Sequence, residues 1–243
     1  MKTLVVGGSS GIGLSLVLNL LGKAECESVY VMDKAPFPDA FLDDRVKFIS
    51  CDLSVGDYSC LKDAEDIQAL YITAGFGHLK FFQELSEEYI QTSFSVNAVA
   101  PVQIIRHFYD RLLSEEGFTC AVMVSIAGRL SSPLFSVYSA TKAALSKFIE
   151  AVNVELDVQG SKNRILEVSP GSLKGTGFTG GTSRPELTAA LADEIIHRAE
   201  DHEELFIPQY DDVFKGVIAR YGADAHKYGV ESYWYKKKRL EGE

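Results

Sequence analysis

Tyr138 and Lys142 are the two side chains whose types and spacing best suit proton transfer. They stand four residues apart at the start of a segment with helical periodicity, so both emerge from one helix face about one turn apart. Tyrosine has an unperturbed pKa of about 10, and a nearby ammonium favours its phenolate, which can take a proton from an alcohol. Many helices carry such a pair by chance, so the spacing alone leaves a plain surface pair as the alternative.

A glycine-rich turn supplies a second chemical feature. Residues 7–13 have the pattern G-x-x-x-G-x-G and directly follow the apolar run 3–6. Backbone amides at a helix N-terminus bind pyrophosphate, and glycine lets the phosphates approach because it has no Cβ. Since the spacing differs from the G-x-G-x-x-G fingerprint of dinucleotide-binding proteins, a merely structural turn is the alternative. The residues expected to hold a cofactor in this turn are Gly7, Ser9, Ser10, Gly11, Ile12 and Gly13.

Two carboxylates follow the second and third apolar runs. Asp33 lies about 20 residues beyond Gly13, where a carboxylate can accept hydrogen bonds from the adenosine ribose and repel a 2′-phosphate. This favours NAD, while the neighbouring Lys34 keeps NADP as the alternative cofactor. Asp33 also suits the start of a turn. Asp52 and Leu53 are expected beside the adenine, with an N-cap as the alternative for Asp52.

The elements that must position these residues alternate between short β-branched runs and longer segments of helical period. This alternation predicts an α/β fold, a Rossmann-type doubly wound parallel sheet flanked by helices on both faces. Two prolines make the link 34–45 too broken for a full helix, and five glycines make 171–181 a loop. The predicted strands are 3–6, 28–32, 46–50, 69–73, 120–125, 164–168 and 205–208, and the predicted helices are 12–21, 87–113, 139–157, 185–198 and 213–221.

Four features occur together in the order and spacing of a known family. They are Tyr138-Ser139-Ala140-Thr141-Lys142, Ser125 before it, Asn97 within Ser95-Val96-Asn97-Ala98, and the glycine-rich turn. The sequence resembles the short-chain dehydrogenase/reductase family from Met1 to about Thr176, nearly three quarters of the chain.

The resemblance implies a role for each of these residues. Tyr138 would be the general acid and base, Lys142 would lower its pKa and bind the nicotinamide ribose, and Ser125 would polarise the substrate oxygen. Asn97 would hold a water that links Lys142 to solvent. The cofactor contacts that the resemblance adds are Ala74 and Gly75 at the ribose, Pro170 and Gly171 beside the nicotinamide, and Leu173 and Thr176 at its carboxamide, together with Tyr138 and Lys142.

Three positions depart from the family pattern. Val6 stands where most relatives carry threonine, and Thr73 replaces an asparagine, so a usual link between central strands is expected to change. Gly175 adds one residue before Thr176 and alters its alignment. Beyond Phe178 the resemblance fades. Aromatic residues that either line an apolar site or pack in the core are Phe76, Phe135, Phe178, Tyr210 and Trp234, and His78 either faces the site or lies on a surface loop.

Composition limits the function classes. The chain has 243 residues, 24 Lys and Arg against 34 Asp and Glu, and a net charge of −10, which disfavours a nucleic-acid partner. The basic run 236–239 is interpreted as a solvated tail. Four cysteines without close sequence spacing indicate neither a disulfide framework nor a metal site. With no apolar segment long enough for a signal peptide or membrane span, a cytoplasmic protein without a membrane partner is expected.

These observations lead to one predicted function and one alternative. We expect a single NAD(P)-binding domain over residues 1–243, with a substrate loop and short helix at 171–200. The predicted function is hydride transfer between nicotinamide and a small-molecule alcohol or ketone, in a homodimer or homotetramer built on the helices that contain Glu87 and Tyr138. The alternative is a dinucleotide-binding sensor or scaffold that no longer catalyses a reaction.

Overall fold

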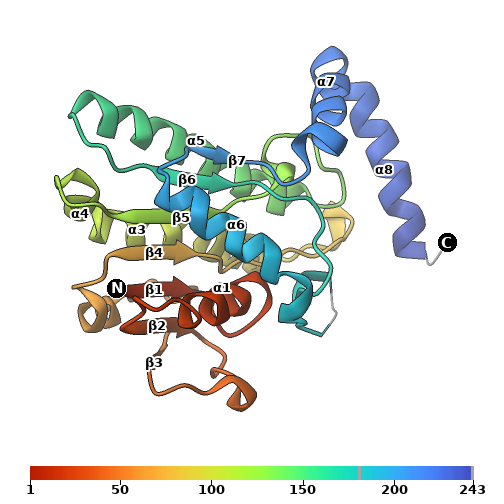
Figure 1. Cartoon of the computed structure of the whole chain (residues 1–243). Helices are drawn as coiled ribbons and strands as arrows, with labels where there is room; N and C mark the ends of the chain where they lie inside the picture. The colour runs from red at the N-terminus through yellow and green to blue at the C-terminus, as the bar shows by residue number, and fades with distance from the viewer. Residues whose placement is uncertain (180–181, 242–243) are drawn as a thin grey trace.

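Seven parallel strands form the central sheet of this computed structural model, which describes residues 1–179 and 182–241. The strand order is β3-β2-β1-β4-β5-β6-β7 (Figure 1). Strands β2 and β3 are thus added on one side of β1, and β4 to β7 are added on its other side. This confirms the predicted Rossmann-type doubly wound fold. The strands are β1 (Lys2–Val6), β2 (Ser28–Asp33), β3 (Val46–Ser50), β4 (Ala69–Ile72), β5 (Thr119–Met123), β6 (Ile165–Val168) and β7 (Leu205–Phe206).

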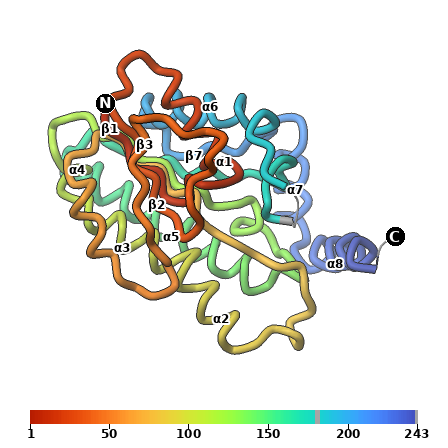
Figure 2. Tube along the Cα trace, turned by 90° about the horizontal axis from the view of Figure 1, so that it is seen from below, coloured from red at the N-terminus to blue at the C-terminus, as the bar shows by residue number. Residues whose placement is uncertain are grey.

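Apolar side chains on both faces of each central strand explain the helix layers. In β1, Leu4 and Val6 point to one face and Val5 to the other, and all three are fully buried. The Val5 face is covered by α1 (Gly11–Leu21) and α6 (Ala189–Glu200). The opposite face is covered by helices that include α3 (Ala100–His107), α4 (Tyr109–Leu113) and α5 (Ser136–Val158), and Figure 2 shows the two layers on either side of the sheet.

The single helix predicted over 87–113 is wrong. The segment consists of α2 (Glu87–Phe94), a π-helical turn η4 (Ser95–Val99), α3 and α4. Pro101 has no N–H to donate to the carbonyl of Asn97 and its ring would crowd that carbonyl in a regular α-helix. The wider π turn just before the proline relieves this conflict.

The C-terminal segment is more ordered than the sequence indicated. After β7 come the π-helical turn η8 (Tyr210–Phe214), α7 (Lys215–Ala223) and the 17-residue α8 (Ala225–Glu241). The basic run 236–239, interpreted as a solvated tail, therefore lies within a helix. In Figure 1, α8 stands beyond the carboxyl ends of the strands, apart from the two helix layers.

The remaining links agree with the sequence patterns. Between β2 and β3 the only helical turn is the three-residue η1 (Asp39–Phe41), as the two prolines predicted. The glycine-rich stretch contains the short turn η6 (Gly177–Thr179), while Gly180 and Gly181 lie outside the described residues. α6, at the end of the 171–200 segment, connects β6 to β7 and packs in the core. No helix among residues 1–179 and 182–241 is both long and apolar enough to cross a membrane.

Candidate active site

The carboxyl edge of the sheet gathers the chemically distinctive residues. Because all strands are parallel, the turns after β1, β2, β4, β5 and β6 open at this same edge. The sites predicted from separate parts of the sequence are Gly7 to Gly13 after β1, Asp33 at the end of β2, Ala74 and Gly75 after β4, Ser125 after β5, and Pro170 and Gly171 after β6.

The glycine-rich turn is packed against the neighbouring strand ends. Gly7 has φ +85°, and a Cβ there would lie 2.5 Å from the backbone nitrogen of Ala74. A Cβ on Gly13 would collide with the Gly7 carbonyl oxygen. Gly11 has φ +54° and begins α1, whose first amides point out of the helix. These glycines therefore allow the close strand-to-helix packing that a pyrophosphate site requires.

Thr73 provides a link between the central strands. Its hydroxyl can donate to either of two carbonyl oxygens of the first turn, that of Val6 at 3.0 Å and that of Gly7 at 3.2 Å. The link between the central strands is therefore kept, and a threonine hydroxyl makes it where the family pattern has an asparagine. The glycine-rich turn remains tied to the end of β4.

Asp33 lies beside the glycine-rich turn. One carboxylate oxygen accepts a hydrogen bond from the Ser9 amide at 3.1 Å, and the other accepts from the Ala35 amide at 3.0 Å. Asp33 therefore starts a turn and also borders the glycine-rich turn that is predicted to hold the cofactor. Ser10 precedes α1 at its N-cap position without a side-chain capping bond, and Ile12 is buried in the first turn.

Asp52 and Leu53 follow β3 at the outer part of the same edge. The Asp52 carboxylate is exposed and accepts from the amide and hydroxyl of Ser54, at 2.9 and 2.7 Å. Both hydrogen bonds lower the pKa of Asp52, and the one from the Ser54 hydroxyl has the larger effect. Leu53 is buried. Asp52 thus caps its own turn while its carboxylate stays at the surface.

Tyr138 and Ser125 come together from α5 and from the end of β5. Both are nearly buried, with 9% and 8% of their surfaces exposed. Burial raises the pKa of Tyr138 to about 12, and the polar Ser125 side chain nearby opposes this rise. The Ser125 oxygen also accepts from the Ala127 amide at 3.1 Å, which fixes the hydroxyl at the start of its turn.

Lys142 lies one turn beyond Tyr138 on the same face of α5. The residue is only 2% exposed. Its amine donates to the Met123 carbonyl at 2.8 Å and lies 5.9 Å from the centre of the Tyr138 ring. Burial lowers the pKa of Lys142 to about 8. A Cβ on Gly75 would approach this amine to 3.3 Å, so glycine keeps the β4 turn close to Lys142.

Asn97 is fully buried in the π-helical turn and connects three parts of the site. Its side-chain oxygen accepts from the Phe76 amide at 2.9 Å, and its side-chain nitrogen donates to the Phe76 carbonyl at 2.8 Å. The same nitrogen donates to the Thr141 hydroxyl at 3.2 Å. Asn97 therefore fixes the loop after β4 against the helix that carries Tyr138 and Lys142.

The segment after β6 crosses the glycine-rich turn. The Gly11 amide donates to the Ser183 hydroxyl oxygen at 2.8 Å, and Thr176 lies beside Gly11 and donates to the Leu173 carbonyl at 3.2 Å. Gly171 packs so closely on Phe214 that a Cβ there would lie 2.5 Å from the ring. Pro170 is buried, and its carbonyl accepts from the Ile126 amide at 3.0 Å. Ser183 and Phe214 were not anticipated, because no local motif marks them.

Phe135 and Phe178 form an aromatic cluster with Tyr138. The Phe178 ring lies 5.0 Å from Tyr138 and 6.2 Å from Phe135, and Phe135 lies 5.8 Å from Tyr138. A Cβ on Gly77 would collide with the Tyr138 ring at 2.7 Å. Of the other aromatic candidates, Phe76 and His78 pack on Tyr89, whereas Tyr210 and Trp234 are exposed.

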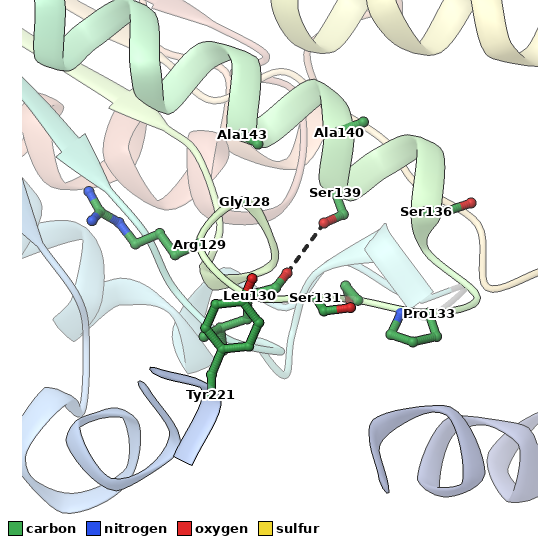
Figure 3. Close-up of a pocket in the computed structure, with 11 residues that line it drawn as sticks. Gly128, Arg129, Leu130, Ser131, Pro133, Ser136, Ser139, Ala140, Ala143 and Tyr221 are labelled. Atoms are coloured by element: carbon green, nitrogen blue, oxygen red, sulfur yellow. Dashed lines mark hydrogen bonds between the residues drawn. The ribbon is translucent and has the colours of Figure 1, made fainter. Parts of the chain in front are cut away.

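A pocket of about 480 Å³ lies beside the loop that follows Ser125. It is bounded by this loop, by Ser136, Ser139, Ala140 and Ala143 of α5, and by Tyr221 of α7 (Figure 3). Of these α5 positions, Ser136 and Ala140 lie on the side of the helix opposite Tyr138. Ser125, Tyr138 and Lys142 are not among the residues that line this pocket.

Comparison with known proteins agrees with this geometry. A model of the short chain dehydrogenase family matches residues 2–186. The chain belongs to the short-chain dehydrogenase family. An oxidoreductase of Saccharomyces cerevisiae, TDA5, is 28% identical over 199 residues, which cover 78% of this chain and 60% of TDA5. The chain thus spans less than two thirds of this relative.

Solved structures of family members share the fold. A short-chain dehydrogenase from Streptomyces avermitilis has a TM-score of 0.75 at 22% identity and covers 95% of this chain and 98% of its own. A short-chain dehydrogenase from Burkholderia cenocepacia, in complex with NADP, has a TM-score of 0.70 at 20% identity and covers 90% of this chain and 96% of its own.

Proposed function

We propose that this member of the family is an NAD(P)-dependent oxidoreductase that interconverts an alcohol and a carbonyl compound. The observation that carries the proposal is the convergence of Ser125, Tyr138 and Lys142 at the carboxyl edge of the sheet, beside the glycine-rich turn. Tyr138 would transfer the proton, and Ser125 would donate a hydrogen bond to the reacting oxygen.

The proton and hydride balance in either direction. When an alcohol is oxidised, its hydroxyl gives a proton to the Tyr138 phenolate. A hydride leaves the carbon that bears this hydroxyl, and that carbon becomes the carbonyl carbon. A bound nicotinamide would supply the acceptor for this hydride or, in the reverse reaction, its donor. In reduction the Tyr138 hydroxyl returns the proton to the carbonyl oxygen.

Lys142 and Asn97 would support Tyr138. Burial, only partly opposed by Ser125, raises the pKa of Tyr138 to about 12, so a positive charge is needed to favour the phenolate. The Lys142 ammonium, at the same helix face, is suited to this task. Asn97 holds the loop after β4 beside Lys142, and we assign it a part in the proton path from Lys142 toward solvent.

The fit to a dinucleotide rests on the glycines and on Asp33. Gly7, Gly13 and Gly75 occupy close approaches that a Cβ would block or narrow, and the carboxylate of Asp33 borders the turn. We propose NAD as the preferred cofactor, because this carboxylate would repel the 2′-phosphate of NADP. The Burkholderia cenocepacia relative is in complex with NADP, so the preference is a specific expectation for this chain.

The decisive experiment combines cofactor binding with turnover. Thermal shift with NADH and with NADPH, followed by NAD(P)H oxidation over a panel of ketones and aldehydes, tests both parts. We expect a larger shift with NADH and measurable turnover. Absence of a shift with either cofactor contradicts the proposal, and binding without turnover favours the non-catalytic sensor.

Tyr138→Phe gives the sharper test of the catalytic role. The variant should still bind the cofactor and lose turnover by a factor of about 10³ or more, because a phenyl ring has no hydroxyl to give or take the proton. Tyr71→Phe serves as the matched control, because it removes a buried tyrosine hydroxyl that has no hydrogen-bond partner in the described part of the chain. Retained turnover in Tyr138→Phe would show that another group transfers the proton.

A further inference from the structure

Lys236, in the C-terminal helix, lies next to the aromatic cluster of the proposed active site. Its amine donates to the Ser132 hydroxyl oxygen at 2.6 Å and to the Pro133 carbonyl at 3.2 Å. It also lies 5.7 Å from the centre of the Phe135 ring, which is itself 5.8 Å from the ring of Tyr138. A single phenyl ring thus separates a lysine amine from the reactive tyrosine.

This amine has only neutral partners. Within the part of the chain that the structure describes, no carboxylate lies within 4.0 Å of Lys236, whereas the next residue, Lys237, is paired with Glu241 at 3.4 Å. Lys236 is half-buried, and burial lowers its pKa to about 8. It remains mostly protonated at neutral pH, so a partly desolvated positive charge lies at the edge of an apolar surface.

A positive charge in this setting gains from an anionic partner. Hydroxyl and carbonyl oxygens and a phenyl ring compensate an ammonium less well than a carboxylate does. The chain as a whole does not attract anions, because its net charge is −10. Any preference for an anion must therefore come from a local cation such as Lys236.

We propose that Lys236 is a specificity-determining residue that binds the carboxylate of the substrate. The substrate class is an alcohol or ketone with an aliphatic chain that ends in a carboxylate. The reacting carbon would lie at Tyr138 and Ser125, the chain along Phe135 and Phe178, and the carboxylate at the Lys236 amine. This inference rests on the proposed oxidoreductase function and names the substrate class of the same site.

The position of α8 fits this role. The helix stands beyond the carboxyl ends of the strands (Figure 1), and it touches the loop after Ser125 through Gly229, which packs on Ser131, and through Lys236. The substrate end of the site would then be formed by the segment in which the family resemblance has faded. Such a segment is where substrate preference can differ between family members that share the same catalytic residues.

Two measurements test the inference, and the first needs no turnover. Calorimetry compares the binding of hexanoate with that of hexanamide, on the protein alone and with NADH. We expect hexanoate to bind at least about tenfold more tightly to the unaltered protein, and Lys236→Met to remove this difference. Lys236→Arg should retain most of it, and Lys237→Met, at the neighbouring paired lysine, should match the unaltered protein.

The second measurement is turnover of oxo acids of six to ten carbons, with the ketone next to the far end, each against its methyl ester. We expect the acid to be preferred at least about tenfold in kcat/KM, mainly through KM, and the preference to fall toward one in Lys236→Met. Lys236→Gln provides a second neutral variant if the methionine variant folds poorly.

The outcomes separate this inference from the proposed function. Equal binding of hexanoate and hexanamide, or a Lys236→Met variant that weakens acid and ester alike, overturns the carboxylate site and assigns Lys236 to anchoring α8. Lys236-dependent binding of hexanoate without any turnover supports the carboxylate site and contradicts the oxidoreductase.

Discussion

Burial acts on Tyr138 and Lys142 in the same sense, toward the uncharged form of each side chain. It raises the pKa of Tyr138 to about 12 and lowers the pKa of Lys142 to about 8. The fold therefore holds the ammonium form of Lys142 in an unfavourable environment. Its one hydrogen bond, to the Met123 carbonyl, offsets this only in part.

Lys142→Met should therefore stabilise the protein at neutral pH while abolishing turnover. A lysine pKa lowered from 10.5 to about 8 destabilises the folded state by up to about 3 kcal/mol, fully below pH 8 and progressively less toward pH 10.5. The sign follows because the unfolded chain binds this proton more tightly than the folded chain. Denaturant unfolding at pH 7 and pH 10 should show a gain that shrinks at the higher pH.

The control for this prediction lies on the same helix. Lys147 is exposed and pairs with Glu150, so Lys147→Met should change the free energy of unfolding little at either pH. A Lys142→Met variant that is less stable than the unaltered protein at pH 7 would contradict the argument. It would mean that the lost hydrogen bond and packing outweigh the cost of the buried charge.

The sequence predicts which residues belong to the candidate site better than it predicts the contacts they make. The types and order of Asn97, Ser125, Tyr138 and Lys142 are visible in the sequence, and the fold brings all four to one region. The contacts of Thr73 were not predictable, because a hydroxyl in place of an amide reaches the same strand through a different geometry. The contacts of Lys236 were not predictable either, because its partners lie about 100 residues away in sequence.

Element prediction succeeded where one pattern dominated. The strands begin and end within one or two residues of their predicted bounds, because runs of buried β-branched residues are bounded by turns. The 87–113 segment failed because its apolar periodicity continues through Pro101, while the backbone must widen before the proline. α8 escaped prediction because most of its surface is exposed and its apolar residues form no clear stripe.

The segment after β6 gives a prediction about cofactor affinity. The Gly11 amide, a predicted pyrophosphate donor, is bound to the Ser183 hydroxyl at 2.8 Å, so a pyrophosphate would have to displace that hydroxyl. Ser183→Ala removes the competing acceptor and should lower the Kd for the cofactor about threefold to tenfold, equivalent to about 1 kcal/mol. Calorimetric titration with NADH measures the change.

The neighbouring Thr182 provides the matched control. It is exposed and makes no hydrogen bond to the glycine-rich turn in the described part of the chain, so Thr182→Ala should leave the Kd unaltered. A weaker cofactor affinity in Ser183→Ala would show instead that the Ser183 contact helps to form the site. In that case the segment after β6 would be a support for the turn rather than its competitor.

At the scale of the whole molecule, strand order decides which residues meet. Sequence periodicity predicts that a parallel sheet forms, yet the neighbours of each strand depend on contacts between distant segments. The order β3-β2-β1-β4-β5-β6-β7 brings β1 beside β4, and this adjacency is what puts the glycine-rich turn against Ala74 and Gly75. The sequence alone predicts the doubly wound sheet without its strand order.

The predicted homo-oligomer can be tested at exposed apolar side chains on the two helical segments named for it. Val154 and Val158 on α5 are 61% and 81% exposed, and Phe94 and Val99 at the π-helical turn are 37% and 46% exposed. Apolar side chains of this kind gain free energy when a second copy covers them. Val154→Asp should therefore convert a dimer or tetramer to smaller species in light scattering. Val55→Asp, at a 74% exposed valine after β3, should leave the mass unchanged. A monomeric unaltered protein would refute the assembly itself, and an unchanged mass in Val154→Asp would move the interface away from α5.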